Sequence, residues 1–296
     1  MYRGTFTALV TPFLADGSVD EPAYRKLVDF QFENGVTGIV PVGTTGESPT
    51  LSHEEHKNVI RLAVEAAKGR GPVIGGTGAN STDEAIELTA AAEAAGCEAV
   101  LQVAPYYNKP SAEGLFQHFK AVADSTKCKI ILYSVPGRCG IDIPVEVTAR
   151  LAAACPNIVS LKEAGGSVER VNQLMAAGLP DSFTILSGDD SLTLPFMAVG
   201  ATGVISVASN LIPRQMSDLV KAALANDLPA ARALHLKYYP LLSAMMKLDS
   251  NPVPIKAAMA LAGHMAGGLR LPMIAMAPDK IAELRTVMAG LNVIEP

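Results

Sequence analysis

Apolar residues fall into two kinds of segment that alternate along the first 228 residues of the chain. Short runs are continuously apolar and rich in β-branched residues, which is typical of parallel strands covered on both faces. The pattern predicts eight such strands, at residues 6–10, 38–42, 72–75, 99–103, 130–133, 158–161, 183–186 and 203–207.

Between these runs the apolar residues follow a helical period, which predicts helices at residues 22–34, 53–68, 83–95 and 112–125 among others. Two of these helices begin with the pattern of a capping box, Ser52-x-x-Glu55 and Ser81-x-x-Glu84. After the eighth strand only helical patterns remain, at residues 234–247, 254–262 and 278–289.

Eight strand-and-helix units predict an α/β fold of the (β/α)8 TIM-barrel class. A doubly wound open sheet is the alternative that the same alternation permits, and the count of eight favours the barrel. We expect residues 1–228 to form a catalytic barrel and residues 229–296 to form a C-terminal helical region. No break in composition separates the two, so we expect the helical region to pack on the barrel.

Composition and charge limit which classes of partner are expected. The 296 residues are 49% apolar and 18% charged, with a net charge of −5 and no basic patch, so a nucleic-acid partner is not expected. The apolar stretch 253–269 is interrupted by Pro254, Lys256 and His264, which excludes a membrane span there. No signal peptide is recognisable. The cysteines lack paired spacing, so we expect reduced thiols in a cytoplasmic protein; they are Cys97, Cys128, Cys139 and Cys155.

Lys162 is the first candidate for chemistry, because it follows the apolar run 157–161 directly. In a barrel the functional groups gather at the carboxyl ends of the strands. An amine buried there loses hydration, which lowers its pKa and leaves it neutral enough to attack a carbonyl. The alternative is a lysine that leaves the strand into solvent and pairs with Glu163, and the residues alone weigh the two equally.

Three further features lie at strand ends. Tyr133 ends the strand before Lys162 and could move protons, or it could simply cap the barrel. The turn 43–47 (GTTGE) could hold a carboxylate, or it could be an ordinary tight turn. Arg138 lies in residues 136–140 (PGRCG), which predict a loop held by one proline and two glycines, and it could clamp a carboxylate with two hydrogen bonds or be solvated. His53 and His56 lie one helical turn apart without an obvious third ligand, so no metal site is expected.

Six motifs, in this order, make the chain resemble the dihydrodipicolinate synthase family of the pyruvate-dependent class I aldolases. They are residues 43–47 (GTTGE), 105–108 (PYYN), 132–138 (LYSVPGR), 161–163 (LKE), 187–190 (SGDD) and 251–256 (NPVPIK). The resemblance covers residue 4 to at least residue 272. It implies condensation of pyruvate with L-aspartate 4-semialdehyde to 4-hydroxy-tetrahydrodipicolinate, the first committed step of diaminopimelate and lysine biosynthesis.

The resemblance also implies a role for each matching residue. Lys162 would form the Schiff base, and Thr45 and Arg138 would bind the carboxylates of pyruvate and of the semialdehyde. The remaining residues would form a proton relay (Tyr133, Thr44 and Tyr107, the last reaching into a neighbouring subunit) or line the pocket (Gly188 and Ile205). No metal or organic cofactor is implied. The resemblance implies a homo-oligomer, and a tetramer is expected rather than a dimer.

A second set of residues matches the pocket that binds L-lysine in feedback-regulated members of the family. The resemblance therefore implies an allosteric L-lysine site made of Ser48, His53, His56, Asn80, Glu84 and Tyr106. Two positions depart from the family: Ser134 replaces the usual Asn, and Cys139 replaces the usual Thr. Hydrogen bonds that orient Tyr133 and Arg138 are therefore expected to differ.

Two other classes of function stay open at this point. N-acetylneuraminate lyases and 2-keto-3-deoxy-sugar-acid aldolases share the lysine and the tyrosine but bind a polyhydroxy chain, whereas Arg138 and the pair Tyr106 and Tyr107 favour the synthase. A non-catalytic ligand-binding barrel would not need the set of Lys162, Tyr133 and Thr44.

Overall fold

The computed structural model describes residues 1–295 and contains one sheet of eight parallel strands. The strands are β1 (Gly4–Ala8), β2 (Gly38–Val40), β3 (Ile74–Gly76), β4 (Ala99–Val103), β5 (Lys129–Ser134), β6 (Ile158–Glu163), β7 (Thr184–Ser187) and β8 (Gly203–Ser206). Their spatial order is β2-β1-β8-β7-β6-β5-β4-β3, and a parallel bridge between Ile39 and Val73 brings the two end strands together. The predicted TIM barrel is confirmed, and the open sheet is excluded.

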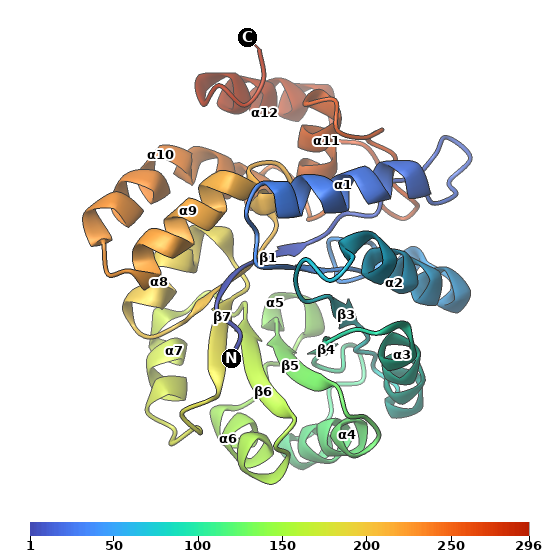
Figure 1. Ribbon diagram of the computed structural model, residues 1–296, viewed down its shortest axis with the longest axis vertical. Helices are drawn as coiled ribbons and strands as arrows, with labels where there is room; N and C mark the ends of the chain where they lie inside the picture. The colour runs from blue at the N-terminus through green and yellow to red at the C-terminus, as the bar shows by residue number, and fades with distance from the viewer. Residues whose placement is uncertain (296) are drawn as a thin grey trace.

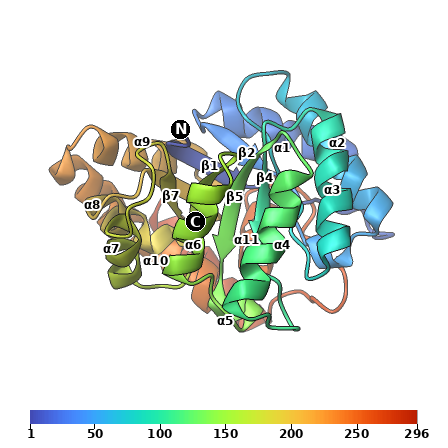
Figure 2. The same ribbon diagram turned by 90° about the horizontal axis from the view of Figure 1, so that it is seen from below.

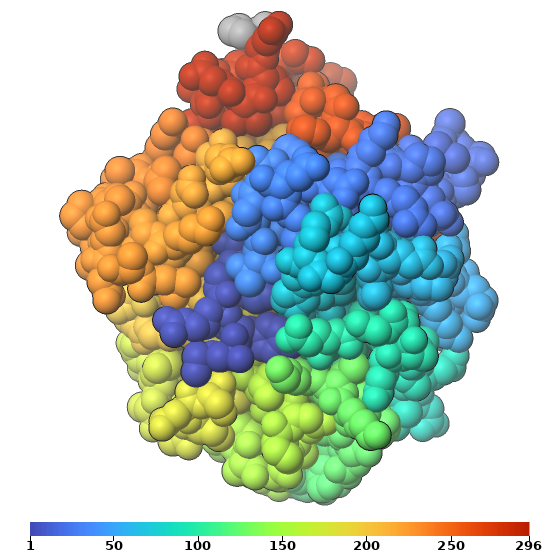
Figure 3. Space-filling view, in the orientation of Figure 1, coloured from blue at the N-terminus to red at the C-terminus, as the bar shows by residue number. Residues whose placement is uncertain are grey.

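Helices surround the strands and bury their outer faces. They are α1 (Glu21–Glu33), α2 (His53–Ala67), α3 (Thr82–Ala95), α4 (Ala112–Asp124), α6 (Val145–Ala154), α7 (Val168–Met175), α8 (Thr193–Ala198) and α9 (Pro213–Leu224). Figure 1 shows them in chain order around the barrel, and in Figure 3 the N-terminal residues lie near the centre of the same face. The buried apolar side chains of strands and helices form one continuous core.

The two predicted capping boxes differ in outcome. At α2 the Ser52 hydroxyl accepts from the backbone N–H of Glu55, and the Glu55 carboxylate accepts from the N–H of Ser52 in return. At α3 the Ser81 hydroxyl accepts from the N–H of Glu84, but the return bond is missing because the Glu84 carboxylate bonds His53 Nε2 at 3.1 Å. The second box was therefore predicted wrongly: a tertiary partner takes its carboxylate.

The C-terminal region consists of α10 (Leu228–Lys247), α11 (Val253–Leu261) and α12 (Pro278–Gly290). Helix α10 packs on α9, and α11 and α12 pack on α10 and on each other, at the top of Figure 1. Helix α10 starts six residues before the predicted start at 234. Asp227 caps it by accepting from Ala230 N, which begins the helix ahead of its main apolar stripe. Within the described residues, no helix is long and apolar enough to cross a membrane.

One expected loop is a helix. Residues 136–140, predicted as a loop held by proline and glycine, form the single-turn helix α5 (Pro136–Cys139). Pro136 has the backbone angle that suits the first turn, and Gly140 ends the helix in the left-handed region at φ 74°. Figure 2 shows α5 at the end of the barrel opposite the N-terminus, the end where the strands finish.

Candidate functional site

Lys162 lies inside the barrel mouth. It pairs in register with Tyr133 of the neighbouring strand β5, and its Nζ lies 4.2 Å from the centre of the Tyr133 ring. The lysine is 6% exposed. The next residue, Glu163, is buried, and its Oε2 accepts from Arg170 Nε at 2.7 Å. A solvent-exposed Lys162 paired with Glu163 is therefore excluded.

Burial changes the chemistry of this amine. The pKa of Lys162 is lowered to about 7: loss of hydration is the main cause, the negative charge of Asp190 opposes it, and the positive charge of Arg138 adds to it. A substantial fraction of the side chain is therefore a neutral amine near neutral pH. A neutral amine is the form that attacks a ketone.

Gly188 makes the room that Lys162 needs. A Cβ atom at this position would lie 3.0 Å from Lys162 Cε and 2.7 Å from the Cβ of Ala164. Both distances are shorter than ordinary contacts, so a larger residue would displace the lysine stem or the strand end. Glycine after β7 is thus a requirement of the close approach between two strand ends.

Side chains from several strand ends meet Lys162 in one cavity. Its lining includes six of the residues proposed from the sequence: Lys162, Tyr133, Thr44, Thr45, Arg138 and Gly188. Helix α5 carries Arg138, which is exposed at the rim and donates from Nη2 to the carbonyl of Asn251 at 3.1 Å. On the β8 side Val207 lines the cavity, whereas the predicted Ile205 is buried two residues earlier.

Tyr133 stays protonated over the ordinary pH range. Burial raises its pKa to about 12, against the opposing effects of the Arg138 charge and the Thr44 hydroxyl. A neutral phenol beside a neutral amine can accept one proton while donating another, which is the requirement for a proton relay.

Asp190 is a charged neighbour that the sequence did not single out as a site residue. Its carboxylate is buried and accepts from the backbone N–H of Val207 at 2.9 Å and of Ala208 at 2.8 Å. Burial raises its pKa to about 6, and the hydrogen bonds oppose that shift. Asp190 ties the end of β7 to the end of β8 and places a negative charge within reach of Lys162. The motif 187–190 contained the only signal for it.

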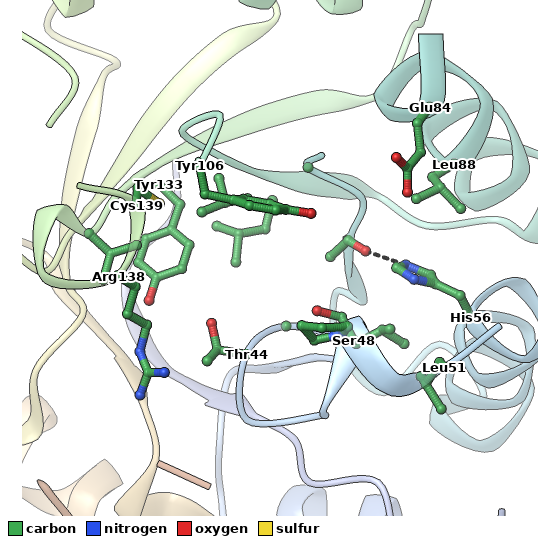
Figure 4. Close-up of a pocket in the computed structure, with 18 of the residues that line it drawn as sticks. Thr44, Ser48, Leu51, His56, Glu84, Leu88, Tyr106, Tyr133, Arg138 and Cys139 are labelled. Carbon is green, nitrogen blue, oxygen red and sulfur yellow. Dashed lines mark hydrogen bonds between the residues drawn. The ribbon is translucent and has the colours of Figure 1, made fainter. Parts of the chain in front are cut away.

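A larger cavity of about 410 Å³ adjoins the first and shares Thr44, Tyr133 and Arg138 with it. Figure 4 shows these three on one side, His56 and Glu84 on the other, and Tyr106 reaching between them. Five of the six residues proposed for L-lysine line this cavity: Ser48, His53, His56, Glu84 and Tyr106. The sixth, Asn80, supports it by donating from Nδ2 to the carbonyl of Tyr106 at 3.2 Å.

The two histidines of this cavity differ in environment. His56 is buried and donates from Nε2 to the carbonyl of Gly76 at 2.7 Å, and burial lowers its pKa. His53 is exposed, and its Nε2 contacts Glu84 Oε1 at 3.1 Å. Within residues 1–295 no group of three or more His, Cys, Asp or Glu side chains is arranged to hold a metal ion.

Tyr107 does not join the other proposed residues. Its side chain is 91% exposed and lines neither of the two cavities, and its backbone has a positive φ of 73°. A left-handed conformation is costly for a tyrosine, so the loop that carries it is held in this shape by its neighbours. Asn108 Nδ2 supplies one such contact by donating to the Asn80 carbonyl at 2.8 Å.

The two departures from the family lie in different surroundings. The Ser134 hydroxyl accepts from the backbone N–H of Ile143 at 3.2 Å, so it orders the chain that leaves α5. Cys139 is buried beside Arg138, and burial raises its pKa to about 11, which keeps it a neutral thiol.

Comparison with known proteins finds close relatives over the full chain. The model of the dihydrodipicolinate synthetase family matches residues 1–290. The 4-hydroxy-tetrahydrodipicolinate synthase of Syntrophus aciditrophicus (strain SB) is 49% identical over 294 residues, covering 99% of this chain and 100% of the relative.

Solved structures agree with the sequence comparison. The chloride-inhibited dihydrodipicolinate synthase from Acinetobacter baumannii complexed with pyruvate is 44% identical, with a TM-score of 0.96 over 99% of this chain and 100% of that one. The enzyme from Cyanidioschyzon merolae with lysine bound is 38% identical, with a TM-score of 0.95 over 99% of each chain.

Proposed function

The chain belongs to the dihydrodipicolinate synthetase family, and we propose that it condenses pyruvate with L-aspartate 4-semialdehyde to give 4-hydroxy-tetrahydrodipicolinate. One observation carries the proposal: Lys162 is a buried amine with a pKa near 7, in contact with the ring of Tyr133 at the mouth of the barrel. This reaction commits carbon to diaminopimelate and lysine biosynthesis. The related sugar-acid lyases are not favoured by the comparisons.

In the proposed reaction Lys162 Nζ attacks the ketone carbon of pyruvate, and water leaves to give an iminium. The iminium draws electrons from the adjacent methyl group, which loses a proton and becomes an enamine. The enamine carbon attacks the aldehyde, whose oxygen takes up a proton. The amine of the second substrate then adds to the iminium carbon, which closes the ring and releases Lys162.

The surrounding residues fit these steps. Tyr133 lies next to the amine, Thr44 lines the same cavity and interacts with the Tyr133 hydroxyl, and both can carry protons to and from the reacting atoms. The buried Thr45 hydroxyl suits the pyruvate carboxylate, deep in the cavity. The exposed Arg138 suits the carboxylate of the second substrate, which arrives later and from outside. The reaction would take place in the cytoplasm, a compartment that the buried free cysteines suit.

Trapping with pyruvate and borohydride tests the enzyme class. Reduction should fix pyruvate on Lys162, and mass spectrometry of the digested protein should locate the adduct there. A non-catalytic binding barrel would give no adduct. Initial rates of pyruvate condensation, measured with L-aspartate 4-semialdehyde and with N-acetylmannosamine, then distinguish the synthase from a sugar-acid lyase.

The proposal extends to a homo-oligomer, a tetramer, in which Tyr107 completes the relay of a neighbouring subunit. The support is its exposed ring, which lines neither cavity of its own chain. Mixed oligomers of a Tyr107→Phe chain and a Lys162→Ala chain should recover activity, because one hybrid site then has both groups. No recovery in verified mixed oligomers would count against a shared site.

The larger cavity is proposed to bind L-lysine as a feedback inhibitor. Glu84 suits an ammonium group, His53 and His56 lie beside it, and Tyr106 connects this cavity with Tyr107 next in sequence. The relative from Cyanidioschyzon merolae was solved with lysine bound. Initial rates measured against rising L-lysine should fall, and Glu84→Gln should weaken the inhibition without loss of basal turnover. Initial rates that stay constant up to L-lysine concentrations of tens of millimolar, roughly the weak end of affinities for a small ligand, would refute the site.

A further inference from the structure

The C-terminal region contributes to the catalytic cavity. Met246, near the end of α10, and Asn251, in the connection from α10 to α11, both line the cavity that contains Lys162. Asn251 is buried, although it belongs to a connecting segment. A buried polar residue in a connection needs a hydrogen-bonding reason for its position.

Asn251 contacts two different substrate-binding candidates. Its side-chain Nδ2 donates to the hydroxyl of Thr45 at 3.1 Å, and its backbone carbonyl accepts from Arg138 Nη2 at 3.1 Å. Thr45 comes from the turn after β2, and Arg138 comes from α5 after β5. One residue therefore joins groups that are proposed to bind two separate carboxylates.

The direction of the first hydrogen bond has a chemical consequence. A hydroxyl that accepts a hydrogen bond from an amide keeps its own proton for another acceptor. With Asn251 as the donor, the proton of the Thr45 hydroxyl is left to point at a carboxylate in the cavity. Hydrogen bonds in such a chain also strengthen one another.

A second attachment holds the same turn. Glu47 lies two residues after Thr45, in a left-handed conformation at φ 56°. Its buried carboxylate bonds Lys256 Nζ from α11 and accepts from the backbone N–H of Arg270 at 3.2 Å. Both attachments come from one short segment, because Asn251 and Lys256 lie five residues apart. The C-terminal region thus fixes the turn 43–47 at two points.

We propose that Asn251 is a positioning residue for both substrates, whose side-chain amide orients the Thr45 hydroxyl toward pyruvate while its backbone carbonyl holds the Arg138 guanidinium at the rim. The assignment rests on the proposed function of Thr45 and Arg138. The two contacts can be tested separately, because a substitution of the Asn251 side chain removes the contact with Thr45 and leaves the backbone contact with Arg138.

The experiment compares Asn251→Ala with Asn157→Ala. Asn157 lies at the opposite end of β6, where its side chain donates to the carbonyls of Ala123 and Thr126, so its loss removes buried hydrogen bonds away from the cavity. Asn251→Ala should raise the KM for pyruvate about fivefold to tenfold, the effect of one neutral hydrogen bond. The KM for the semialdehyde should change less than twofold. Asn157→Ala should change neither.

A second variant and a double-mutant cycle keep the test decisive. Asn251→Asp retains the shape of the side chain, but its carboxylate accepts a hydrogen bond from the Thr45 hydroxyl instead of donating one. The pyruvate KM of this variant should therefore also rise above the wild-type value. In a Thr45→Val background, Asn251→Ala should add little. Equal effects with and without Thr45, or a pyruvate KM as unchanged as in Asn157→Ala, would overturn the assignment. Failure of the wild-type protein to use pyruvate at all would instead reject the proposed function.

Discussion

Two buried lysines of this chain differ in whether they bond a carboxylate. Lys162 opens into the catalytic cavity and has no bonded carboxylate among its described contacts, whereas Lys256 is fully buried and bonds Glu47. Burial lowers the pKa of both, but at Lys256 the carboxylate opposes the shift through charge and a hydrogen bond. Burial by itself therefore does not make a lysine a nucleophile. An open cavity and the absence of a bonded carboxylate are also needed.

The aromatic neighbours of the two amines are similar, so they do not account for the difference. Lys162 Nζ lies 4.2 Å from the centre of the Tyr133 ring, and Lys256 Nζ lies 4.1 Å from the centre of the Phe13 ring. A ring face stabilises an ammonium in both places. At Lys256 the ion pair adds a fixed connection between α11 and the turn 43–47. At Lys162 the amine remains free to react.

Replacing the free lysine should have the largest effect. Lys162→Ala removes the amine that is proposed to form the covalent intermediate, so turnover should fall at least about 1,000-fold. Pyruvate trapping by borohydride should disappear. Lys129→Ala, which changes an exposed lysine at the start of β5, should trap pyruvate as the wild type does. A pyruvate adduct on another lysine of Lys162→Ala would contradict the assignment.

Replacing the paired lysine should reduce stability rather than chemistry. Lys256→Met leaves the Glu47 carboxylate buried without its cation, a loss of about 3–5 kcal/mol of unfolding free energy. Lys256→Met combined with Glu47→Leu removes both charges and should recover most of this loss. Urea unfolding measures the stability, and borohydride trapping should still label Lys162 in the double variant. A double variant as unstable as the single one would show that charge is not the cause.

The cation beside Lys162 can be removed as well. Arg138→Ala should lower kcat/KM for the semialdehyde roughly 30- to 150-fold, because a charged hydrogen bond to the carboxylate of the semialdehyde is lost. This factor corresponds to about 2–3 kcal/mol of transition-state free energy. Trapping of pyruvate should remain, because Arg138 is exposed at the rim and Lys162 is buried below it. Arg150→Ala on the surface of α6 is the control. Loss of trapping in Arg138→Ala would move this residue to the pyruvate side.

The pH dependence should show the smallest effect and the most specific one. With a folded pKa of about 7, Lys162 is protonated below that pH, so kcat/KM for pyruvate should fall about tenfold per unit on the acid side. Asp190 raises this pKa by its charge, so Asp190→Asn should move the acid limb to lower pH. Asp181→Asn removes an exposed carboxylate and should not move it. A limb that moves upward in Asp190→Asn would show that the charge of Asp190 does not control the amine.

The strand pattern could be predicted because buried parallel strands are locally distinctive. All eight were placed from continuous apolar runs, and β4 matches its predicted bounds. Errors of one or two residues occurred at the ends of the other strands, where backbone bonds to neighbouring strands decide the limit. The start of α10 was missed because a polar cap and a proline, rather than an apolar stripe, begin that helix.

The site was predictable only as far as its residues follow strands in the sequence. Lys162 and Tyr133 stand at the ends of consecutive strands, so their contact follows from the fold. Asn251 meets Thr45 from 206 residues away, and no local pattern carries that contact. The structure also separates residues that a motif treats alike: Tyr106 is 39% exposed and lines a cavity, whereas its neighbour Tyr107 is 91% exposed and lines none.

The junction of β2 and β3 has a consequence for dynamics. These strands have three residues each, and the bonds of Ile39 N to Pro72 O and Gly76 N to Pro41 O join their edges, whereas β5 and β6 pair over five positions. A Cβ at Gly76 would lie 2.4 Å from the Val42 carbonyl, so the backbones already touch without side chains to reinforce them. Local opening should therefore require least free energy here, and amide hydrogens of β2 and β3 should exchange before those of β5 and β6. The larger cavity is lined by Val42 and Gly76 on either side of this junction, so a molecule bound there would slow that exchange.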